Sequence, residues 1–209
     1  MREYWLVRPK PHNILRIHEF LSQNIIAIGW PALGDLTHLS RENLKDRLKQ
    51  PPYALDSYAW GQAYATVDIF VNQMKPGDLV LVPNGDDIYF GRIAGDYHFD
   101  PAKADESNGY PHQRSVEWLS NCGRSALSLD LRSSLKAPRT IAQLSNHAAE
   151  IEALSRGERC ETTTSNSVQT LPVSYPLRPD FSVSFEIPKD ITKEEAQRLS
   201  TYFASLYFN

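Results

Sequence analysis

The stretch Met74-Lys-Pro-Gly-Asp-Leu-Val-Leu-Val-Pro83, followed by Ile88-Tyr-Phe-Gly-Arg-Ile-Ala94, predicts a turn, a buried strand and a hairpin. Lys75 to Asp78 has turn chemistry, because proline pre-sets a negative φ and glycine tolerates a positive one. Leu79 to Val82 is apolar throughout, which is typical of a strand buried on both faces. Asn84-Gly85 is a strong signal for a two-residue hairpin turn, whose central residues need positive φ.

On either side of this hairpin, the hydrophobic pattern predicts strands with helices between them. This arrangement indicates an α+β fold with a mixed sheet. The expected elements are strands at Tyr4 to Arg8, Ile25 to Trp30 and His112 to Leu119, a helix capped by Asn13, a helix capped by Ser40, a longer helix from Ser57, and a helix opened by the capping-box pattern Thr140-x-x-Gln143.

The 209 residues suit one domain with an appendage. We expect a main domain over residues 1–156, a polar linker over 157–179 and a C-terminal tail over 180–209. In the tail, Phe181 to Ile187 alternates as a strand, and Thr192-x-x-Glu195 is a second capping box. A tail this short cannot bury a sufficient core alone, so it must dock on the main domain or on another chain. Its expected docking surface contains Phe203, Leu206, Tyr207 and Phe208.

Bulk properties exclude several classes of protein. The net charge of −3 gives no global attraction for nucleic acid, so such binding would need a local basic patch, for example among Arg2, Arg8, Lys10 and Arg16. No window approaches the ~20 apolar residues that span a bilayer, and no signal peptide opens the chain. Two distant cysteines and scattered histidines predict a cytoplasmic protein without a zinc site or other cofactor.

A series of short motifs carries a family resemblance. They are Tyr4-Trp5-Leu6-Val7, Ile28-Gly29-Trp30 followed by Gly34-Asp35-Leu36-Thr37, the Lys-Pro-Gly-Asp turn, Gly91-Arg92-Ile93, and His112-Gln113-Arg114-Ser115-Val116-Glu117-Trp118. In this order and spacing, the first three quarters of the chain resembles the EVE-like branch of the PUA-like superfamily, which includes the YTH and ASCH domains. The segment Leu131 to Ile141 resembles the sequence that comes after such barrels in bacterial restriction-associated proteins.

This resemblance implies a PUA-like mixed β-barrel with peripheral helices, carrying the C-terminal strand and helix as an appendage. It also implies a reader that holds a flipped, often modified, base of DNA in an aromatic pocket and serves a nuclease or motor partner. Flipping costs a few kcal/mol, which aromatic faces and hydrogen bonds must repay. Two alternatives stay open: an RNA-binding module, which would depend on the 2′-OH, and an interaction protein with a vestigial pocket.

The candidate base-binding residues come from the same resemblance. Trp30 ends a strand before Pro31 and matches the position of a cage tryptophan, although a core role is about equally expected. The second wall would come from Tyr97, Phe99 or Tyr110, with Tyr110 preferred; the family pattern has tryptophan there, and packing within the loop is the commoner role for such a tyrosine. Arg114 would contact phosphate, unless it simply faces solvent, and His112 could assist. Asp35 or Asn84 would bond the base edge.

No catalytic constellation is recognisable in the sequence. Asp68 with Lys75 is the nearest match to a metal-dependent nuclease centre, but a helix and the turn after it are the wrong placement. There is no Gly-x-Ser-x-Gly elbow and no Walker-type loop. We therefore expect a protein that is not an enzyme, unless Cys122 has a depressed pKa in a cleft.

Overall fold

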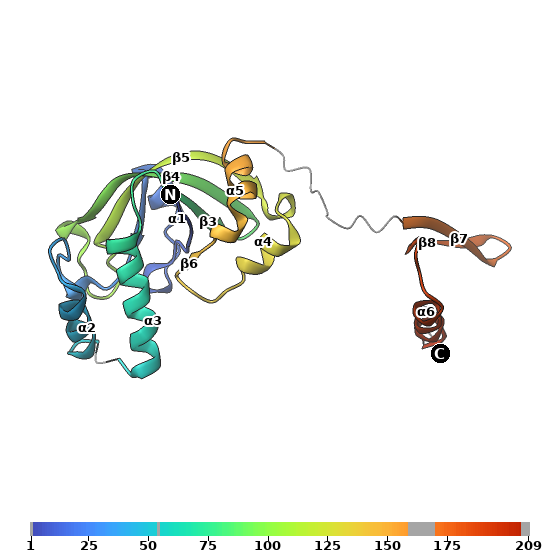
Figure 1. The fold of residues 1–209 in the computed structure, drawn as a ribbon, viewed down its shortest axis with the longest axis horizontal. Helices are drawn as coiled ribbons and strands as arrows, with labels where there is room; N and C mark the ends of the chain where they lie inside the picture. The colour runs from blue at the N-terminus through green and yellow to red at the C-terminus, as the bar shows by residue number, and fades with distance from the viewer. Residues whose placement is uncertain (1, 54, 159–169, 206–209) are drawn as a thin grey trace. The chain divides into compact units, whose positions relative to one another are not determined.

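The computed structural model describes residues 2–53, 55–158 and 170–205. It divides the chain into two compact units, Met1–Thr162 and Thr163–Asn209, called here the main unit and the C-terminal unit. In the main unit, a six-stranded sheet curls into a half-barrel with helices beside it (Figure 1). This unit is therefore a mixed α+β fold with a barrel-like sheet.

The sheet of the main unit has the strand order β2-β5-β4-β3-β1-β6. Only β1 and β3 pair in parallel, and all other neighbours are antiparallel. The predicted strands are confirmed, although the second ends at Ile28 rather than Trp30, and the fourth and fifth run on further than expected. The strands are β1 (Tyr4–Val7), β2 (Ile25–Ile28), β3 (Leu79–Asn84), β4 (Asp87–Phe99), β5 (His112–Gly123) and β6 (Ile141–Gln143).

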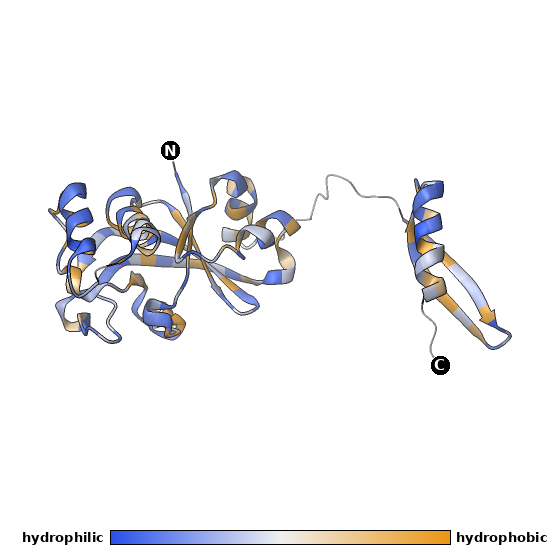
Figure 2. Cartoon of the chain, turned by 90° about the horizontal axis from the view of Figure 1, so that it is seen from below, coloured by the Kyte–Doolittle hydropathy of each residue, from blue (hydrophilic) through white to orange (hydrophobic). Residues whose placement is uncertain are grey.

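Side-chain alternation along the strands creates two separate cores. In β3, Val80 and Val82 belong to one core, and Leu79 and Leu81 belong to the other. The first core is covered by α1 (Ile17–Gln23), α2 (Arg41–Lys49) and α3 (Ser57–Asp68), and the second by α4 (Leu129–Ser134) and α5 (Ala148–Ser155). Figure 2 shows hydrophobic segments, in orange, along these strands. This is why the apolar run that predicted β3 is buried on both faces.

The hairpin between β3 and β4 turns one residue later than the sequence predicts. Asn84 pairs with Asp87, so Gly85 and Asp86 form the two-residue loop. Gly85 has a φ of 60°, and Asn84 remains in the strand. A turn with a positive φ only at its first central position needs a single glycine, so asparagine was not required there.

Helix starts were predicted with mixed success. Ser40 caps α2 by accepting a hydrogen bond from Asn43 N at 3.2 Å, as expected. Ser57 is the first residue of α3, and Asp56 caps it. Asn13 caps no helix: it has a φ of 62° in a short turn, and α1 begins only at Ile17. Asparagine is equally suited to a cap and to a left-handed turn, and here the turn prevails.

The capping-box prediction at Thr140-x-x-Gln143 is wrong. Residues Ile141–Gln143 form β6, which pairs antiparallel with Val7 to Trp5 of β1. Leu144 N then donates to Tyr4 O at 2.7 Å, and the following helix begins only at Ala148. The free edge of β1 offers hydrogen-bond partners that a local helix would leave unpaired, so tertiary pairing outweighs the local signal.

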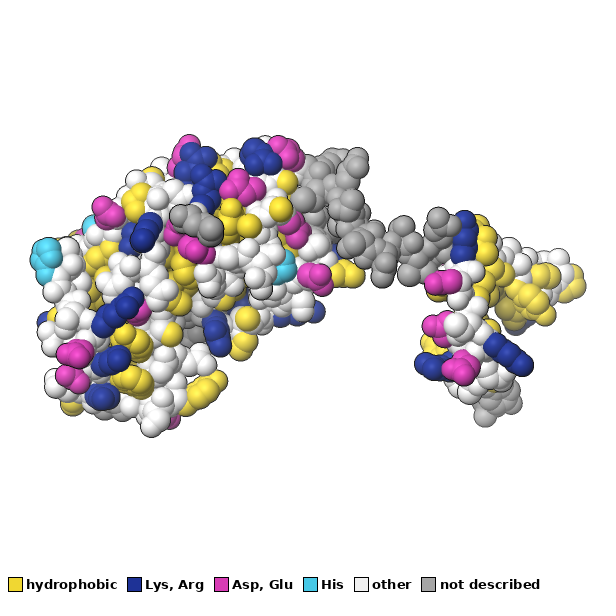
Figure 3. Space-filling view, in the orientation of Figure 1, with side chains coloured by type: hydrophobic (Ala, Val, Ile, Leu, Met, Phe, Trp, Pro, Cys, Tyr) yellow, Lys and Arg dark blue, Asp and Glu magenta, His cyan; other side chains and the backbone are white. Residues whose placement is uncertain are grey.

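A ladder of cross-helix contacts joins α2 to α3. Arg41 Nε lies 2.9 Å from an oxygen of Asp68. One and two turns along α2, the ammonium of Lys45 lies 5.3 Å from the ring centre of Tyr64, and that of Lys49 lies 5.3 Å from Trp60. Figure 3 shows dark-blue basic side chains in a row beside yellow ones over these two helices. Each turn of α2 therefore contributes one cation to the contact with α3.

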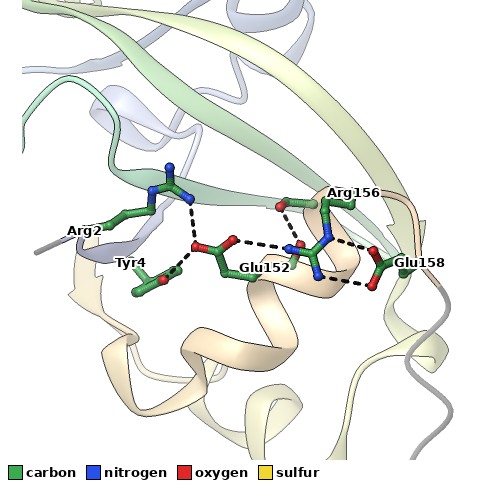
Figure 4. A network of polar contacts seen from close by, with 6 residues as sticks. Arg2, Tyr4, Glu152, Arg156 and Glu158 are labelled. Atoms are coloured by element: carbon green, nitrogen blue, oxygen red, sulfur yellow. Dashed lines mark hydrogen bonds and ion pairs between the residues drawn. The ribbon is translucent and has the colours of Figure 1, made fainter.

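A polar network links α5 to the start of β1 (Figure 4). Glu152 accepts hydrogen bonds from Arg2 Nη1 at 2.7 Å and from the Tyr4 hydroxyl at 2.9 Å. Arg156 lies 3.4 Å from Glu152 and 2.7 Å from Glu158. Solvent screens exposed pairs of this kind, so the network positions α5 more than it stabilises the fold.

The C-terminal unit contains β7 (Thr170–Arg178), β8 (Phe181–Pro188) and α6 (Lys193–Ser205). The predicted strand and capping box are confirmed: Thr192 N donates to Glu195 at 2.9 Å, and Glu195 N donates to Thr192 Oγ1 at 3.3 Å. The predicted linker over 157–179 is wrong over Thr170–Arg178, which form β7. Pro172 and Pro176 are typical of a linker, so the sequence did not indicate a strand there. Leu206, Tyr207 and Phe208 of the predicted docking surface lie outside the described residues.

Candidate binding cavity beside Trp30

A cavity of about 280 Å³ opens where β2 ends. Four segments of the main unit supply its walls, and they are distant in sequence. These segments are the chain after β1, the end of β2, a residue following α2 and a residue preceding β6. The lining residues are Lys10, Pro11, His12, Asn13, Ile28, Gly29, Trp30, Tyr53 and Thr140.

The cavity wall holds an unusual concentration of left-handed backbone. His12 has a φ of 52°, Asn13 of 62° and Trp30 of 63°; across the described ranges, the one other non-glycine residue with positive φ is Asn24. This conformation costs an L-residue about 1–2 kcal/mol, and it is least expected for a bulky side chain such as tryptophan. Strain of this kind gathers at functional sites, which makes the cavity the leading candidate site.

His112 and Tyr97 hold the backbone of Trp30 in place. Nε2 of His112 lies 3.0 Å from the Trp30 carbonyl oxygen, which can only accept, so Nε2 carries the proton. Nδ1 then accepts from the Tyr97 hydroxyl at 2.8 Å, and that hydroxyl accepts from Leu36 N at 3.3 Å. Both ring nitrogens of His112 and the hydroxyl of Tyr97 therefore have hydrogen-bond partners when the imidazole is neutral.

The protonation states of this pair follow from their burial. Burial lowers the pKa of His112 to about 4 and raises the pKa of Tyr97 to about 12. Both groups are therefore neutral at pH 7. His112 and Tyr97 were predicted as base contacts; His112 is fully buried and supports the carbonyl of Trp30 instead.

Planar side chains surround the cavity. Trp30 is half-buried, with its hidden part against the first core. Tyr53 is also half-buried, and its hydroxyl accepts from Ala32 N at 3.0 Å. His12 packs over Gly29, where an added Cβ would lie 3.1 Å from its Nε2. The absence of a side chain at Gly29 thus lets the His12 ring approach the backbone closely.

Charged groups of both signs lie in or near the cavity lining. Lys10 is an exposed cation in the lining. Burial raises the pKa of Tyr53, and Glu106 in the loop after β4 adds a smaller effect in the same direction. Hydrogen bonds from Ser107 lower the pKa of Asp105 in the same loop, with a smaller contribution from His12. An anionic group of a ligand would be favoured beside Lys10.

Tyr110, like every predicted contact except Trp30, lies outside the cavity lining. Tyr110 is 4% exposed and packs in the first core, with Arg16 and Lys103 lying 5.2 and 5.3 Å from its ring centre. It is a packing residue and forms no cage wall in this structure. The loop after β4 folds back over it, whereas the sequence showed only a tyrosine before proline.

Arg114 is also buried, at 2% exposed, which contradicts both a phosphate contact and a solvent-facing position. Nε donates to Phe70 O at 2.7 Å, Nη2 to Val71 O at 3.0 Å and Nη1 to Gly95 O at 3.3 Å. Phe70 and Val71 lie in the π-helical turn Ile69–Gln73 that follows α3. The guanidinium thus satisfies carbonyls that the helix end leaves unpaired, and burial lowers its pKa to about 10.

Asp35 and Asn84 are not part of the cavity lining. Asp35 is exposed and accepts from the backbone and side chain of Thr37 at 2.9 and 2.6 Å, which lowers its pKa. Asn84 pairs with Asp87, which pairs with Gly123, whereas Trp30 follows the strand that pairs with His112. The two ends of β5 are roughly 30 Å apart along the strand, so Asn84 and Trp30 cannot share a ligand of base size.

Sequence reasoning identified Trp30 but missed most of the lining. His12 and Asn13 carried a weak signal, since Pro11-His12-Asn13 resembles turn chemistry. Tyr53 follows a Pro-Pro pair that indicated only the end of a helix. Thr140 carried no signal, because its position depends on the β1–β6 pairing, which Arg8 N extends by donating to Thr140 O at 2.9 Å.

Other candidate sites are less developed. A larger hollow of about 460 Å³ lies on Glu194, Gln197, Arg198 and Thr201, but a single helix cannot enclose a ligand. Over the described ranges, no three His, Cys, Asp or Glu side chains gather as a metal site would require. No helix in these ranges is both long and apolar enough to cross a membrane.

The fold and cavity define a small α+β half-barrel protein with an aromatic pocket at the end of an edge strand. The model of a family called domain of unknown function DUF8426 matches residues 7–145, and the chain belongs to this family. Every residue that lines the cavity lies within the matched range, and the C-terminal unit lies outside it. Searches of curated proteins and of solved structures gave no match.

Proposed function

We propose that this chain is a non-catalytic nucleic-acid-binding module that encloses one unstacked base in the cavity beside Trp30. The main unit would then be a PUA-like barrel of the EVE-like branch, acting as a reader of modified DNA for a bacterial defence system. The observation that carries this proposal is the left-handed Trp30, held by His112 at the wall of a cavity lined by planar side chains.

The size and chemistry of the cavity suit a single base. Pockets for drug-sized ligands occupy about 300–1,000 Å³, so a cavity of about 280 Å³ fits a smaller group such as one ring system with a substituent. Trp30, Tyr53 and His12 offer planar faces, and stacking on an aromatic side chain stabilises a bound base by about 1–3 kcal/mol. This repays the few kcal/mol that unstacking costs.

Because Arg114 is buried, we propose that Lys10 contacts the phosphate instead. Lys10 is exposed and lines the cavity, whereas the acidic residues Asp105 and Glu106 lie in the loop after β4, outside the lining. With a net charge of −3, the protein relies on such a local contact, so few counterions are released on binding. Each phosphate contact adds about 0.7–0.9 to the magnitude of the slope of log K against log salt, so the single contact at Lys10 should give a shallow slope of about one.

The test is a fluorescence-anisotropy titration with matched short DNAs, unmodified or carrying methyl, hydroxymethyl or glucosylated bases, and with the equivalent RNA. Trp30→Ala should weaken binding about 5- to 150-fold, the loss expected from one stacked base. The matched control is Trp60→Ala on α3, outside the cavity lining, which should bind within twofold of the wild type.

The outcome decides between the candidate functions. A preference for one modified DNA that Trp30→Ala abolishes supports the reader. Preference for RNA, lost when the 2′-OH is removed, would indicate an RNA-binding module instead. No binding to any of these probes at low salt would refute nucleic-acid binding and favour a protein-interaction role.

A further inference from the structure

The C-terminal unit has no buried core among its described residues. None of residues 171–205 is buried, whereas the main unit contains two buried clusters. Six large hydrophobic side chains of this unit are 44–63% exposed: Leu171, Tyr175, Leu177, Phe181, Tyr202 and Phe203. A piece of this size needs a disulfide, a metal or association to be stable. Both cysteines, Cys122 and Cys160, precede the unit, and its described residues hold no metal-binding cluster, so association is the remaining source of stability.

The exposed apolar area is large enough for a stable interface. Leu171 pairs with Ile187 and Val173 with Phe185, which places these side chains on one face of the hairpin. The helix α6 covers part of this face, with the rings of Phe185 and Phe203 5.5 Å apart. Figures 2 and 3 show hydrophobic residues continuing along the hairpin. Six half-exposed side chains present roughly 600 Å², and one side of a standard interface buries about 800 Å², somewhat over half of it apolar.

The two edges of the hairpin differ in their capacity to pair. Pro172 lies opposite Glu186, and Pro176 lies opposite Ser182. Proline has no N–H to donate, so each proline occupies a non-hydrogen-bonded pair. In such a pair, the backbone N–H positions of both residues point away from the neighbouring strand. The outer edge of β7 therefore lacks two donors. The outer edge of β8 keeps its donors at Ser182 and Ser184, so β8 is the edge that can receive another strand.

We propose that the C-terminal unit is a dimerisation module, in which β8 pairs antiparallel with β8 of a second copy of this chain. A two-fold axis perpendicular to the hairpin then produces a four-stranded sheet with both α6 helices on one face, where each helix covers apolar residues that a single copy leaves exposed. Residues 170–205 contain four basic and five acidic residues, so two copies do not repel each other strongly. This nearly neutral surface does not suit a polyanion as the occupant. The proposal is independent of the base-binding cavity, which lies in the other unit.

The test uses the full chain and a matched pair of proline variants. Ser174 and Ser184 face each other across the hairpin, and both are exposed. This pair lies two positions from each proline pair, so the N–H groups of Ser174 and Ser184 also point away from the neighbouring strand. Ser174→Pro therefore removes one donor from the outer edge of β7, and Ser184→Pro removes one from the outer edge of β8. Light scattering after size exclusion, at tens of micromolar, should give the wild type and Ser174→Pro twice the chain mass of 23.7 kDa. Ser184→Pro should give the mass of one chain, with a dimer dissociation constant raised at least tenfold.

Three results would overturn the proposal. A wild-type protein with the mass of one chain has no dimer to explain. Equal dissociation of both proline variants would mean that proline disrupts the hairpin itself and that the β8 edge has no special role. A dimeric Ser184→Pro would place the interface elsewhere. Since the proposed dimer does not involve the cavity, Trp30→Ala should remain dimeric whether or not the wild type binds nucleic acid.

Discussion

Lowering the pH from 7 to 4 is expected to destabilise the main unit through one buried side chain, His112. Its Nε2–H donates to Trp30 O at 3.0 Å, and its Nδ1 accepts from the Tyr97 hydroxyl at 2.8 Å. Adding a proton to Nδ1 removes this second hydrogen bond and places a charge where no water reaches. Burial accordingly lowers the pKa of His112 from 6.5 to about 4, opposed in part by its bond to Trp30 O.

The direction and size of the effect follow from proton linkage. Between pH 6.5 and 4, the unfolded chain binds a proton on His112 and the folded chain does not, so stability falls as the pH falls. The contribution of His112 to the free energy of unfolding is fully present above pH 6.5. One unit of pKa difference corresponds to about 1.4 kcal/mol, so the full loss on reaching pH 4 and below is about 3 kcal/mol. This is a large part of the 5–15 kcal/mol that stabilises a typical domain.

Urea unfolding followed by tryptophan fluorescence provides the assay. Trp5, Trp30, Trp60 and Trp118 all belong to the main unit, so the signal reports that unit alone. Between pH 7.5 and 4.5, the unfolding free energy of the wild type should fall by about 2–3 kcal/mol more than that of His112→Gln. His18→Gln, a change at an exposed histidine, should parallel the wild type. Parallel curves for the wild type and His112→Gln throughout this range would refute the reasoning.

Three further predictions concern stability and are read from the same unfolding curves. Asp78→Ala should lower the free energy of unfolding by about 3 kcal/mol or more. The Asp78 carboxylate accepts hydrogen bonds from Glu3 N, Trp5 Nε1 and Lys75 N at 2.9–3.0 Å, and the substitution would leave these three N–H groups unpaired. A loss under about 1 kcal/mol would contradict this. Gly91→Ala should lower the free energy of unfolding by about 1–3 kcal/mol, since a Cβ there would collide with Val116 and Trp118. Gly61→Ala in α3, where an added Cβ meets no neighbour within 4 Å, should raise it by about 0.5–1 kcal/mol. A change of the same sign in both variants would be inconsistent with this packing. A double-mutant cycle of Lys49→Ala and Trp60→Ala should give a coupling energy of about 0.5–1 kcal/mol from the contact at 5.3 Å, and additive losses would exclude this contact in solution.

Local sequence signals predicted the elements whose formation depends on neighbouring residues. The apolar run at β3, the Ser40 cap of α2 and the capping box of α6 are all present. Each depends on contacts within a few positions, so the sequence alone suffices to recognise it. The C-terminal strand β8 was also found, because its alternation is not interrupted by proline.

Predictions failed where a distant segment decides the outcome. Ile141–Gln143 became a strand because the edge of β1 was free, and no local pattern records that edge. Arg114 lies on a strand whose alternation favours an exposed position, yet the π-helical turn after α3 places its carbonyls over it. The cavity lies between these cases: Trp30 was recognisable from its position before Pro31, but its left-handed backbone and its neighbours Lys10 and Tyr53 depend on the assembled sheet.

The pairing of β6 with β1 has a consequence for the order of folding. Thr140 lines the cavity, and its carbonyl oxygen accepts a hydrogen bond from Arg8 N, 132 positions earlier in the sequence. Contacts of such long range form late, after shorter loops have closed. A chain emerging from the ribosome can therefore assemble β1 to β5 before the cavity has its last wall. If the cavity binds a base as proposed, binding should appear only once residues beyond Gln143 have been made, and a chain truncated before β6 should form the rest of its sheet without binding.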